Sequence, residues 1–312
     1  MKHQRTLSQR STPFETASVG GVKVRITCEP PPLNVLPDRS YLPFLTAVAG
    51  NASDDDLVVH LTLGPCPVCQ TATPLFESDR SWWMLRDSDE YFLRAKGVEL
   101  RHRGDWIARF RRPTSRVLLH CNPELVSEAD GVRTLLCPFR YPLDQLLLMY
   151  HLAERGGVLT HAAGGAIHGV GMIFPGRSGA GKSTISRQLV GVPGVQLLSD
   201  DRMIVRKMEG GFRAFGTPWP GDAKIAVNDS APLRAICFLA HGAEHKLAEI
   251  TPAKAMELLM PVTSLPWFDK DVLPSALATC EELVSTVAAF QLYFKPDPGV
   301  APILEELAAR LC

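Results

Sequence analysis

The stretch that decides the fold of this chain is Gly176-Arg177-Ser178-Gly179-Ala180-Gly181-Lys182-Ser183. It follows the pattern G-x-x-x-x-G-K-[ST], in which the glycines let successive backbone N–H groups turn inward around phosphate oxygens. Lys182 adds a positive charge for the β- and γ-phosphates, and the Ser183 hydroxyl suits Mg²⁺. The pattern predicts a site for a nucleoside triphosphate with Mg²⁺.

The neighbouring residues support this interpretation. Val170 to Phe174 is an apolar run typical of a buried strand, and Lys182 to Val190 has the pattern of a helix that ends at Gly191 and Pro193. A glycine-rich turn without function is the alternative, but the full motif between a strand and a helix favours phosphate binding. We therefore expect the nucleotide-binding residues to run from Gly176 through Thr184.

Composition places the chain among globular proteins. It has 312 residues, 46% of them hydrophobic, and its 33 Lys and Arg balance its 33 Asp and Glu. We therefore expect no global field that would hold nucleic acid or a membrane surface. A local run of arginines is expected to be a solvated face: Arg101, Arg103, Arg109, Arg111, Arg112 and Arg116. No long apolar segment is found, which predicts a cytoplasmic protein.

Eight cysteines are scattered along the chain, which favours reduced thiols over a disulfide framework. Cys66 and Cys69 have the spacing of a zinc knuckle. No second pair of ligands follows them, so we expect loop cysteines and leave a metal site there as the alternative.

Pattern along the chain predicts an α/β fold in two parts. A smaller β-rich domain over residues 1–140 has short strands and no constellation of chemical groups, and it is available to bind a substrate or partner. A helix from Pro142 to about Arg155 joins the halves. From residue 141 to residue 312, strands alternate with helices as in a nucleotide-binding domain. Its expected later elements are strands at Val195–Leu198, Met203–Arg206, Phe212–Phe215, Ala235–Leu239 and Ala288–Phe294, and helices at Pro252–Met260, Ser275–Val287 and Pro302–Leu311.

Two adjacent acids, Asp200 and Asp201, follow Lys182 by eighteen residues at the end of the strand predicted at Val195–Leu198. If this strand is a neighbour of the loop's strand, its terminal acids lie beside the γ-phosphate and Mg²⁺. One acid can then hold the metal ion while the other takes a proton from an attacking hydroxyl. An acid pair that merely forms a turn or a helix cap is the alternative.

His161 lies at the end of another predicted strand, shortly before the strand of the glycine loop. A single histidine is often structural. An adjacent strand could instead carry its imidazole to the same mouth, where it would help to place metal, phosphate or the catalytic acid.

These residues resemble HPr kinase/phosphorylase and the related HPr-kinase-like proteins, which share a core with ATP-dependent phosphoenolpyruvate carboxykinases. The resemblance rests on His161, the segment Gly176 to Thr184 and the hydrophobic-x-D-D segment that ends in Asp200 and Asp201. A weaker match is Gly216-Thr217-Pro218-Trp219-Pro220-Gly221, which is similar to the G-T-P-W element of HPr-kinase-like proteins.

The resemblance implies ATP-dependent phosphorylation of a hydroxyl, with ATP and Mg²⁺ bound at the loop. Carried over, Asp200 becomes the catalytic base, Asp201 and Ser183 the metal ligands, and His161 and Lys182 further catalytic residues. The acceptor would be a peptide, a small protein or a small hydroxylated molecule, and homo-oligomerisation is left open. The chain departs from the bifunctional enzymes in having Thr184 where they usually carry Glu, and it lacks an R-P-G-R-N-like segment.

Three other functions remain as alternatives. A P-loop ATPase or GTPase would fit the loop, although the L-S-G-G and N-K-x-D motifs of two such classes are missing. A nucleotide-binding module without turnover needs the same site. A phosphoenolpyruvate carboxykinase would require a longer chain and a dedicated set of arginines.

Overall fold

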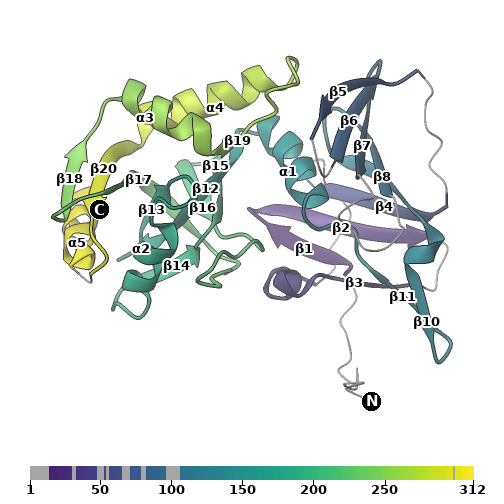
Figure 1. Cartoon of the computed structure of the whole chain (residues 1–312), viewed down its shortest axis with the longest axis horizontal. Coiled ribbons are helices and arrows are strands. Elements are labelled where there is room, and N and C mark those ends of the chain that lie inside the picture. The colour runs from purple at the N-terminus through teal and green to yellow at the C-terminus, as the bar shows by residue number, and fades with distance from the viewer. Residues whose placement is uncertain are drawn as a thin grey trace.

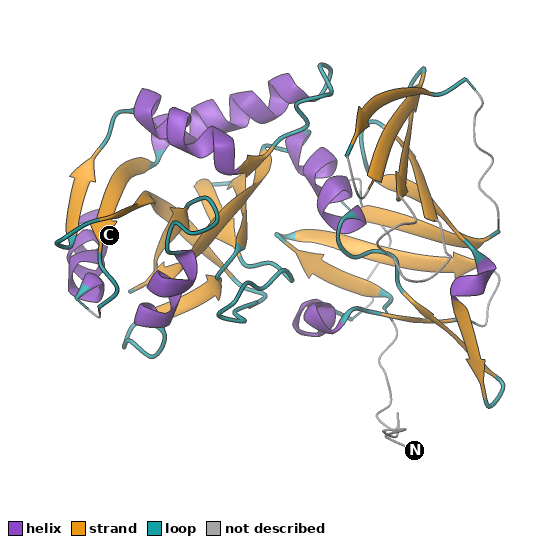
Figure 2. Ribbon diagram, viewed as in Figure 1, coloured by secondary structure: helices purple, strands orange, loops and turns teal. Residues whose placement is uncertain are grey.

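The computed structural model describes residues 14–29, 33–47, 53, 56–64, 71–78, 82–95, 106–297 and 299–312. The fold is mixed α/β, with most of its regular structure in strands, which form sheets of eight, three and nine strands. The two larger sheets lie at opposite ends of the molecule (Figures 1 and 2). Cys66, Cys69, Arg101 and Arg103 lie outside the described residues.

The eight-stranded sheet is built from the N-terminal part of the chain. Its strand order is β1 (Thr16–Val19), β2 (Val22–Glu29), β4 (Leu57–Leu63), β9 (Arg116–Cys121), β8 (Trp106–Arg111), β7 (Glu90–Ala95), β6 (Trp82–Asp87) and β5 (Thr73–Glu77). A three-stranded sheet has the order β10 (Val126–Ala129), β11 (Val132–Leu136) and β3 (Asn34–Leu36). Asp130 and Gly131 join β10 to β11 with positive φ angles of 52° and 73°, as a two-residue hairpin turn favours.

The nine-stranded sheet contains the C-terminal strands. Its main order is β13 (Val170–Pro175), β12 (Gly157–Ile167), β15 (Arg202–Met208), β16 (Gly211–Phe215), β17 (Ser230–His241), β20 (Ala288–Phe294) and β18 (Lys246–Glu249). Two shorter strands, β14 (Val195–Ser199) and β19 (Thr263–Ser264), also pair with β12. β17 pairs in parallel with both β13 and β20, so these three strands end at the same edge.

The helices are α1 (Leu143–Ala153), α2 (Lys182–Leu189), α3 (Pro252–Leu259), α4 (Leu273–Thr286) and α5 (Val300–Leu311), with short 3₁₀ turns at Arg39–Phe44, Pro123–Leu125 and Met260–Val262. Thr251 caps α3 by accepting a hydrogen bond from the Lys254 N–H, and Pro252 occupies its first turn. Among the helices that the structure describes, none is long and apolar enough to cross a membrane.

The strands and helices predicted above are confirmed to within a few residues, except that β17 begins five residues before its predicted start at Ala235, and Ala288–Phe294 has the predicted bounds. β8 was not predicted. Its side chains alternate, with Trp106, Ala108 and Phe110 buried and the arginines facing outward. Of the arginines expected to form a solvated face, Arg109 and Arg111 lie on one side of this strand and both bind Glu90, whereas Arg112 binds Glu154 and Arg116 begins β9.

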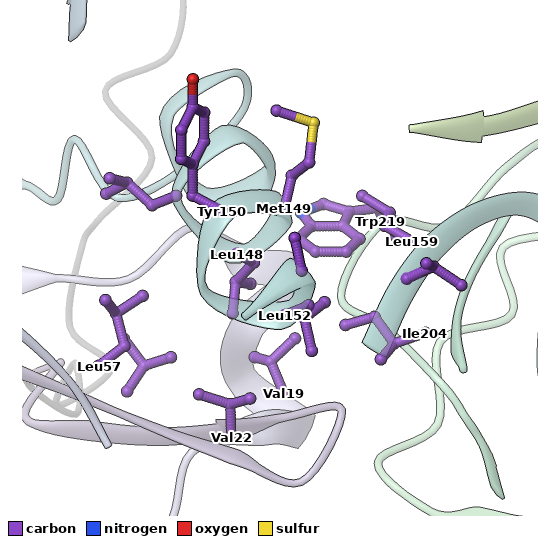
Figure 3. Packing of buried hydrophobic residues seen from close by; sticks show 14 of the residues in the cluster. Val19, Val22, Leu57, Leu148, Met149, Tyr150, Leu152, Leu159, Ile204 and Trp219 are labelled. Atoms are coloured by element: carbon purple, nitrogen blue, oxygen red, sulfur yellow. The ribbon is translucent and has the colours of Figure 1, made fainter. Parts of the chain in front are cut away.

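One hydrophobic cluster joins the two large sheets. Figure 3 shows α1 between them, with Leu148 and Leu152 packed among Val19, Val22 and Leu57 on one side and Leu159 and Ile204 on the other. The boundary predicted at residue 140 lies just before this helix. Strands before residue 140 belong to the eight- and three-stranded sheets, and strands after it belong to the nine-stranded sheet. The buried apolar core nevertheless continues across this boundary.

Candidate functional site

A single strand, β12, brings the predicted site residues to one edge of the sheet. It pairs antiparallel with β13 on one side, with Ala162 opposite Pro175, and with β15 on the other, with His161 opposite Arg202. β14 is also antiparallel to β12, so β13 and β14 run in the same direction. The glycine loop after β13 and the acids after β14 therefore meet beside His161. The sequence argument depended on the condition that β13 and β14 are neighbours; β12 lies between them and still brings their ends together.

The loop from Gly176 to Gly181 depends on glycine for its conformation. Gly179 and Gly181 have φ angles of 81° and 101°, which L side chains rarely adopt. At Gly181 a Cβ atom would lie 2.5 Å from Cζ of Phe294, so there is also no space for a side chain. The Gly176 N–H donates to the His161 carbonyl at 3.1 Å, which ties the start of the loop to β12.

Lys182 begins α2 and is buried, with 6% of its surface exposed. Its Nζ donates to the carbonyl oxygens of Gly176 at 2.9 Å and Arg177 at 3.2 Å, so the charge lies against the loop. Burial lowers the pKa of Lys182, and the negative charge of Asp201 opposes that effect only in part. Ser183 and Thr184 follow in the first turn and are half-buried, whereas Arg177, Ser178 and Gly179 are exposed.

Asp201 and His161 form the polar pair of the site. Asp201 Oδ1 lies 2.7 Å from Nε2 of His161, and both side chains are partly exposed. Burial raises the pKa of Asp201, but the hydrogen bond from His161 and the charges of His161, Arg202 and Lys182 outweigh it and leave the pKa below its ordinary value. The carboxylate is therefore ionised at neutral pH and lies within electrostatic range of Lys182.

Asp200 is placed differently from its neighbour. It is 1% exposed, and its two carboxylate oxygens accept three backbone hydrogen bonds, from Gly221 at 2.8 Å, Ala223 at 2.6 Å and Ile225 at 3.2 Å. Both oxygens are thus occupied by main-chain donors from one loop. The structure does not bring this carboxylate to the mouth of the glycine loop, which is where the predicted role of base would require it.

The loop from Gly216 to Ile225 brackets the strand end that carries the acids. Thr217 Oγ1 donates to the Arg202 carbonyl at 2.6 Å. Arg202 follows the two acids in the sequence, so the loop binds the chain both at Asp200 and just after Asp201. Gly221 has no space for a side chain, because a Cβ there would lie 2.8 Å from Asp200 Oδ2. The loop from Gly216 to Ile225 therefore positions Asp200 and Arg202, and with them Asp201 between the two.

Trp219 anchors this loop in the core. It is 8% exposed, and its Nε1 donates to Asp144 Oδ2 at 2.7 Å, an oxygen that also accepts from Tyr41 Oη at 2.7 Å. Asp144 is fully buried at the start of α1, and burial raises its pKa to about 6 against the opposing effect of these hydrogen bonds. No local pattern predicts this link, because its three members lie far apart in the sequence.

The described part of the chain contains no cluster of metal-ligating side chains, and none of its cysteines forms a disulfide. No group of three or more His, Cys, Asp or Glu side chains there could hold a metal ion by itself. The six cysteines within the described ranges are free thiols, as predicted: Cys28, Cys121, Cys137, Cys237, Cys280 and Cys312. The alternative of a metal at Cys66 and Cys69 falls on residues that are not described.

The sequence was compared with known protein families and with curated proteins. Residues 143–270 are similar to the family described as SynChlorMet cassette protein ScmC. No curated protein matches the chain. The matched residues cover less than half of the chain, and they include α1, His161, the glycine loop, both acids and the bracketing loop.

Proposed function

We propose that this protein is an ATP-dependent kinase of the HPr-kinase-like group that transfers the γ-phosphate to a hydroxyl. The acceptor is a Ser or Thr side chain of a peptide or small protein, or a small hydroxylated molecule. The observation that carries the proposal is the placement of Asp201, which binds His161 at 2.7 Å and lies within electrostatic range of Lys182 beside the glycine loop. A phosphate-binding loop and an ionised acid in one mouth are what hydroxyl phosphorylation requires.

Asp201 takes the role of proton acceptor in this proposal. Its Oδ1 binds His161, and among the described residues its Oδ2 has one ion-pair partner, the Arg202 Nε at 3.8 Å. The acceptor hydroxyl would therefore donate its proton to Oδ2. Asp200 supports the site by fixing the backbone of the bracketing loop, which is a different role from the one its sequence position predicts.

Lys182 and the loop would bind the β- and γ-phosphates. A phosphate oxygen would replace the two loop carbonyls that now accept from Lys182 Nζ, and the backbone N–H groups at the start of α2 would supply further donors. Mg²⁺ fits the donor set present. It needs one or two protein oxygens beside phosphates and water, and the Ser183 hydroxyl has no hydrogen-bond partner among the described residues.

A cytoplasmic location is part of the proposal. ATP is the phosphate donor, and free thiols such as those described here persist in a reducing compartment.

The test is a transfer assay with the purified full chain. The protein is incubated with Mg²⁺, γ-labelled ATP and the peptides encoded by neighbouring genes, and the products are identified by mass spectrometry. We expect a phosphorylated Ser or Thr with the wild-type chain and with Arg187→Ala, an exposed residue of α2, but none with Lys182→Ala. Release of inorganic phosphate without a labelled acceptor would indicate an ATPase instead. ATP binding without turnover would indicate a nucleotide-binding module.

A further inference from the structure

Arg202 lies in the mouth of the site and has no role in the function proposed so far. It follows Asp201 directly and is the first residue of β15. In the antiparallel ladder its partner is His161, so the two side chains project from the same face of the sheet. The guanidinium and the imidazole therefore flank the Asp201 carboxylate from adjacent strands.

The guanidinium of Arg202 is held loosely for a side chain that is only 25% exposed. Its Nε lies 3.8 Å from Asp201 Oδ2, and its Nη1 lies 3.5 Å from the Ser264 hydroxyl. Arg109, by contrast, is held tightly in a structural ion pair, with two hydrogen bonds of 3.0 and 2.6 Å to Glu90. Within the described residues, most of the five N–H donors of Arg202 therefore have no acceptor.

The charged groups around Arg202 are Lys182 and two acids. Asp200 is held by three backbone donors and still acts electrostatically on Lys182, whereas Asp201 is the acid next to Arg202. Arg202 lowers the pKa of both Asp201 and Lys182, so the three charges lie within range of one another. Because the guanidinium of Arg202 makes no close ion pair with Asp201, its N–H donors suit a substrate that brings further negative charge, as a transferring phosphoryl group does.

We propose that Arg202 is a catalytic arginine, supplied by the same chain, that donates hydrogen bonds to the γ-phosphoryl group during transfer. This inference rests on the kinase function proposed above. In the step, the bond between the γ-phosphorus and the β,γ-bridging oxygen breaks, and its electron pair leaves with ADP. A bond forms from the acceptor oxygen to phosphorus, while the acceptor proton passes to Asp201. The guanidinium stabilises the charge on the phosphoryl oxygens during transfer. Lys182 and the loop bind ATP in the ground state.

The test compares Arg202→Gln and Arg202→Lys with the matched control Arg187→Gln. Because ADP with aluminium fluoride and Mg²⁺ mimics the transferring phosphoryl group, its affinity is measured by calorimetry beside that of ATP. For Arg202→Gln we expect kcat to fall by about 10²–10³-fold and the affinity for the aluminium fluoride complex to fall in parallel, with ATP affinity changed less than about threefold. Arg202→Lys keeps the charge without the planar fork and should recover only part of kcat.

Other results would overturn this assignment. Unchanged kcat in Arg202→Gln, or an equal loss of ATP affinity, excludes a contact made only during transfer. A lower kcat with undiminished affinity for the aluminium fluoride complex, and a shifted acid limb of the pH–rate profile, would make Arg202 a residue that only positions Asp201. The kinase function fails separately, if the wild-type chain transfers no phosphate or if Lys182→Ala binds and turns over ATP normally.

Discussion

At the scale of single residues, two adjacent aspartates have opposite environments. Asp201 is half-buried, ionised and paired with His161, whereas Asp200 accepts three backbone hydrogen bonds from one loop. Successive side chains at a strand end point in different directions, so one neighbour can face the loop while the other is buried. Their mutants should therefore fail for different reasons.

We expect Asp201→Asn to abolish transfer and Asp200→Asn to destabilise the fold. Asp201→Asn removes the proton acceptor, so kcat should fall by about 10²–10⁴-fold while ATP binding persists. Asp200→Asn replaces one acceptor oxygen with a donor that faces backbone N–H groups, which should cost about 2 kcal/mol of unfolding free energy.

Single-turnover transfer and urea unfolding of both variants separate these effects. If Asp201→Asn recovers its rate at high Mg²⁺ concentration, Asp201 is a metal ligand, as the resemblance to HPr-kinase-like proteins implies. If Asp200→Asn is as stable as wild type but inactive, the roles assigned here to the two acids are reversed.

Lys182→Ala is expected to weaken ATP binding by about tenfold or more and to stop turnover. The variant loses the buried charge that lies beside the loop carbonyls, and charge-assisted hydrogen bonds to phosphate are worth about 1.5–3 kcal/mol each. Calorimetry with ATP and Mg²⁺ measures the affinity, with Arg187→Ala as the control on the same helix. Unchanged affinity would remove the phosphate-loop assignment.

At the scale of elements, the loop from Gly216 to Ile225 connects the site to the core. One part holds Asp200, another holds the Arg202 carbonyl through Thr217, and Trp219 reaches Asp144 at the start of α1. The position of Asp201 therefore depends on a buried carboxyl group in another element. That carboxyl group also makes the stability of this connection depend on pH.

The pKa of Asp144 is raised from 3.8 to about 6 in the folded protein. Folding thus favours its protonated form, so its contribution to stability is present below about pH 4 and is lost as the pH rises through about 6. Asp144→Asn cannot ionise. Relative to wild type, its unfolding free energy should therefore increase by up to about 3 kcal/mol between pH 4 and pH 8.

Urea unfolding of both proteins across this range measures the difference. Asp130→Asn, in the exposed turn between β10 and β11, is the control and should follow wild type at every pH. A difference between Asp144→Asn and wild type that stays constant with pH would show that Asp144 does not titrate in this range.

At the scale of the whole molecule, the two large sheets share one hydrophobic cluster through α1. Stacked and tilted rings add a second junction, where Phe268 lies 4.7 Å from Phe76 and 5.8 Å from Trp82 between ring centroids. Tyr150 on α1 also donates to Asp269 at 3.0 Å. The N-terminal sheet is thus packed against the part of the chain that carries the site.

We therefore expect the chain to unfold in one cooperative transition, although it is long enough for two domains. Leu148→Ala, at a fully buried position of α1, should lower the stability of the whole transition by about 2–5 kcal/mol. Val190→Ala, at an exposed position, should change it little. Calorimetry of the full chain checks this. Two separate transitions, with only one shifted by Leu148→Ala, would support independent domains with the boundary near residue 140.

The sequence by itself determined the local features of this protein. The glycine loop, the apolar run of β13, the helix after it and most other strands and helices follow from residue type and spacing, because backbone preference and burial period act over a few residues. The convergence of His161, the loop and Asp201 was also predictable, although the strand order that produces it was not.

Only the tertiary structure decided which acid faces the loop. Asp200 and Asp201 have the same chemistry, and the choice between them comes from N–H groups more than twenty residues away, on Gly221, Ala223 and Ile225. The contact of Trp219 with Asp144 spans 75 residues, and the shared core joins segments still farther apart. These interactions form only when the sheets pack, because no local pattern along the chain encodes which distant donors will reach a buried carboxylate.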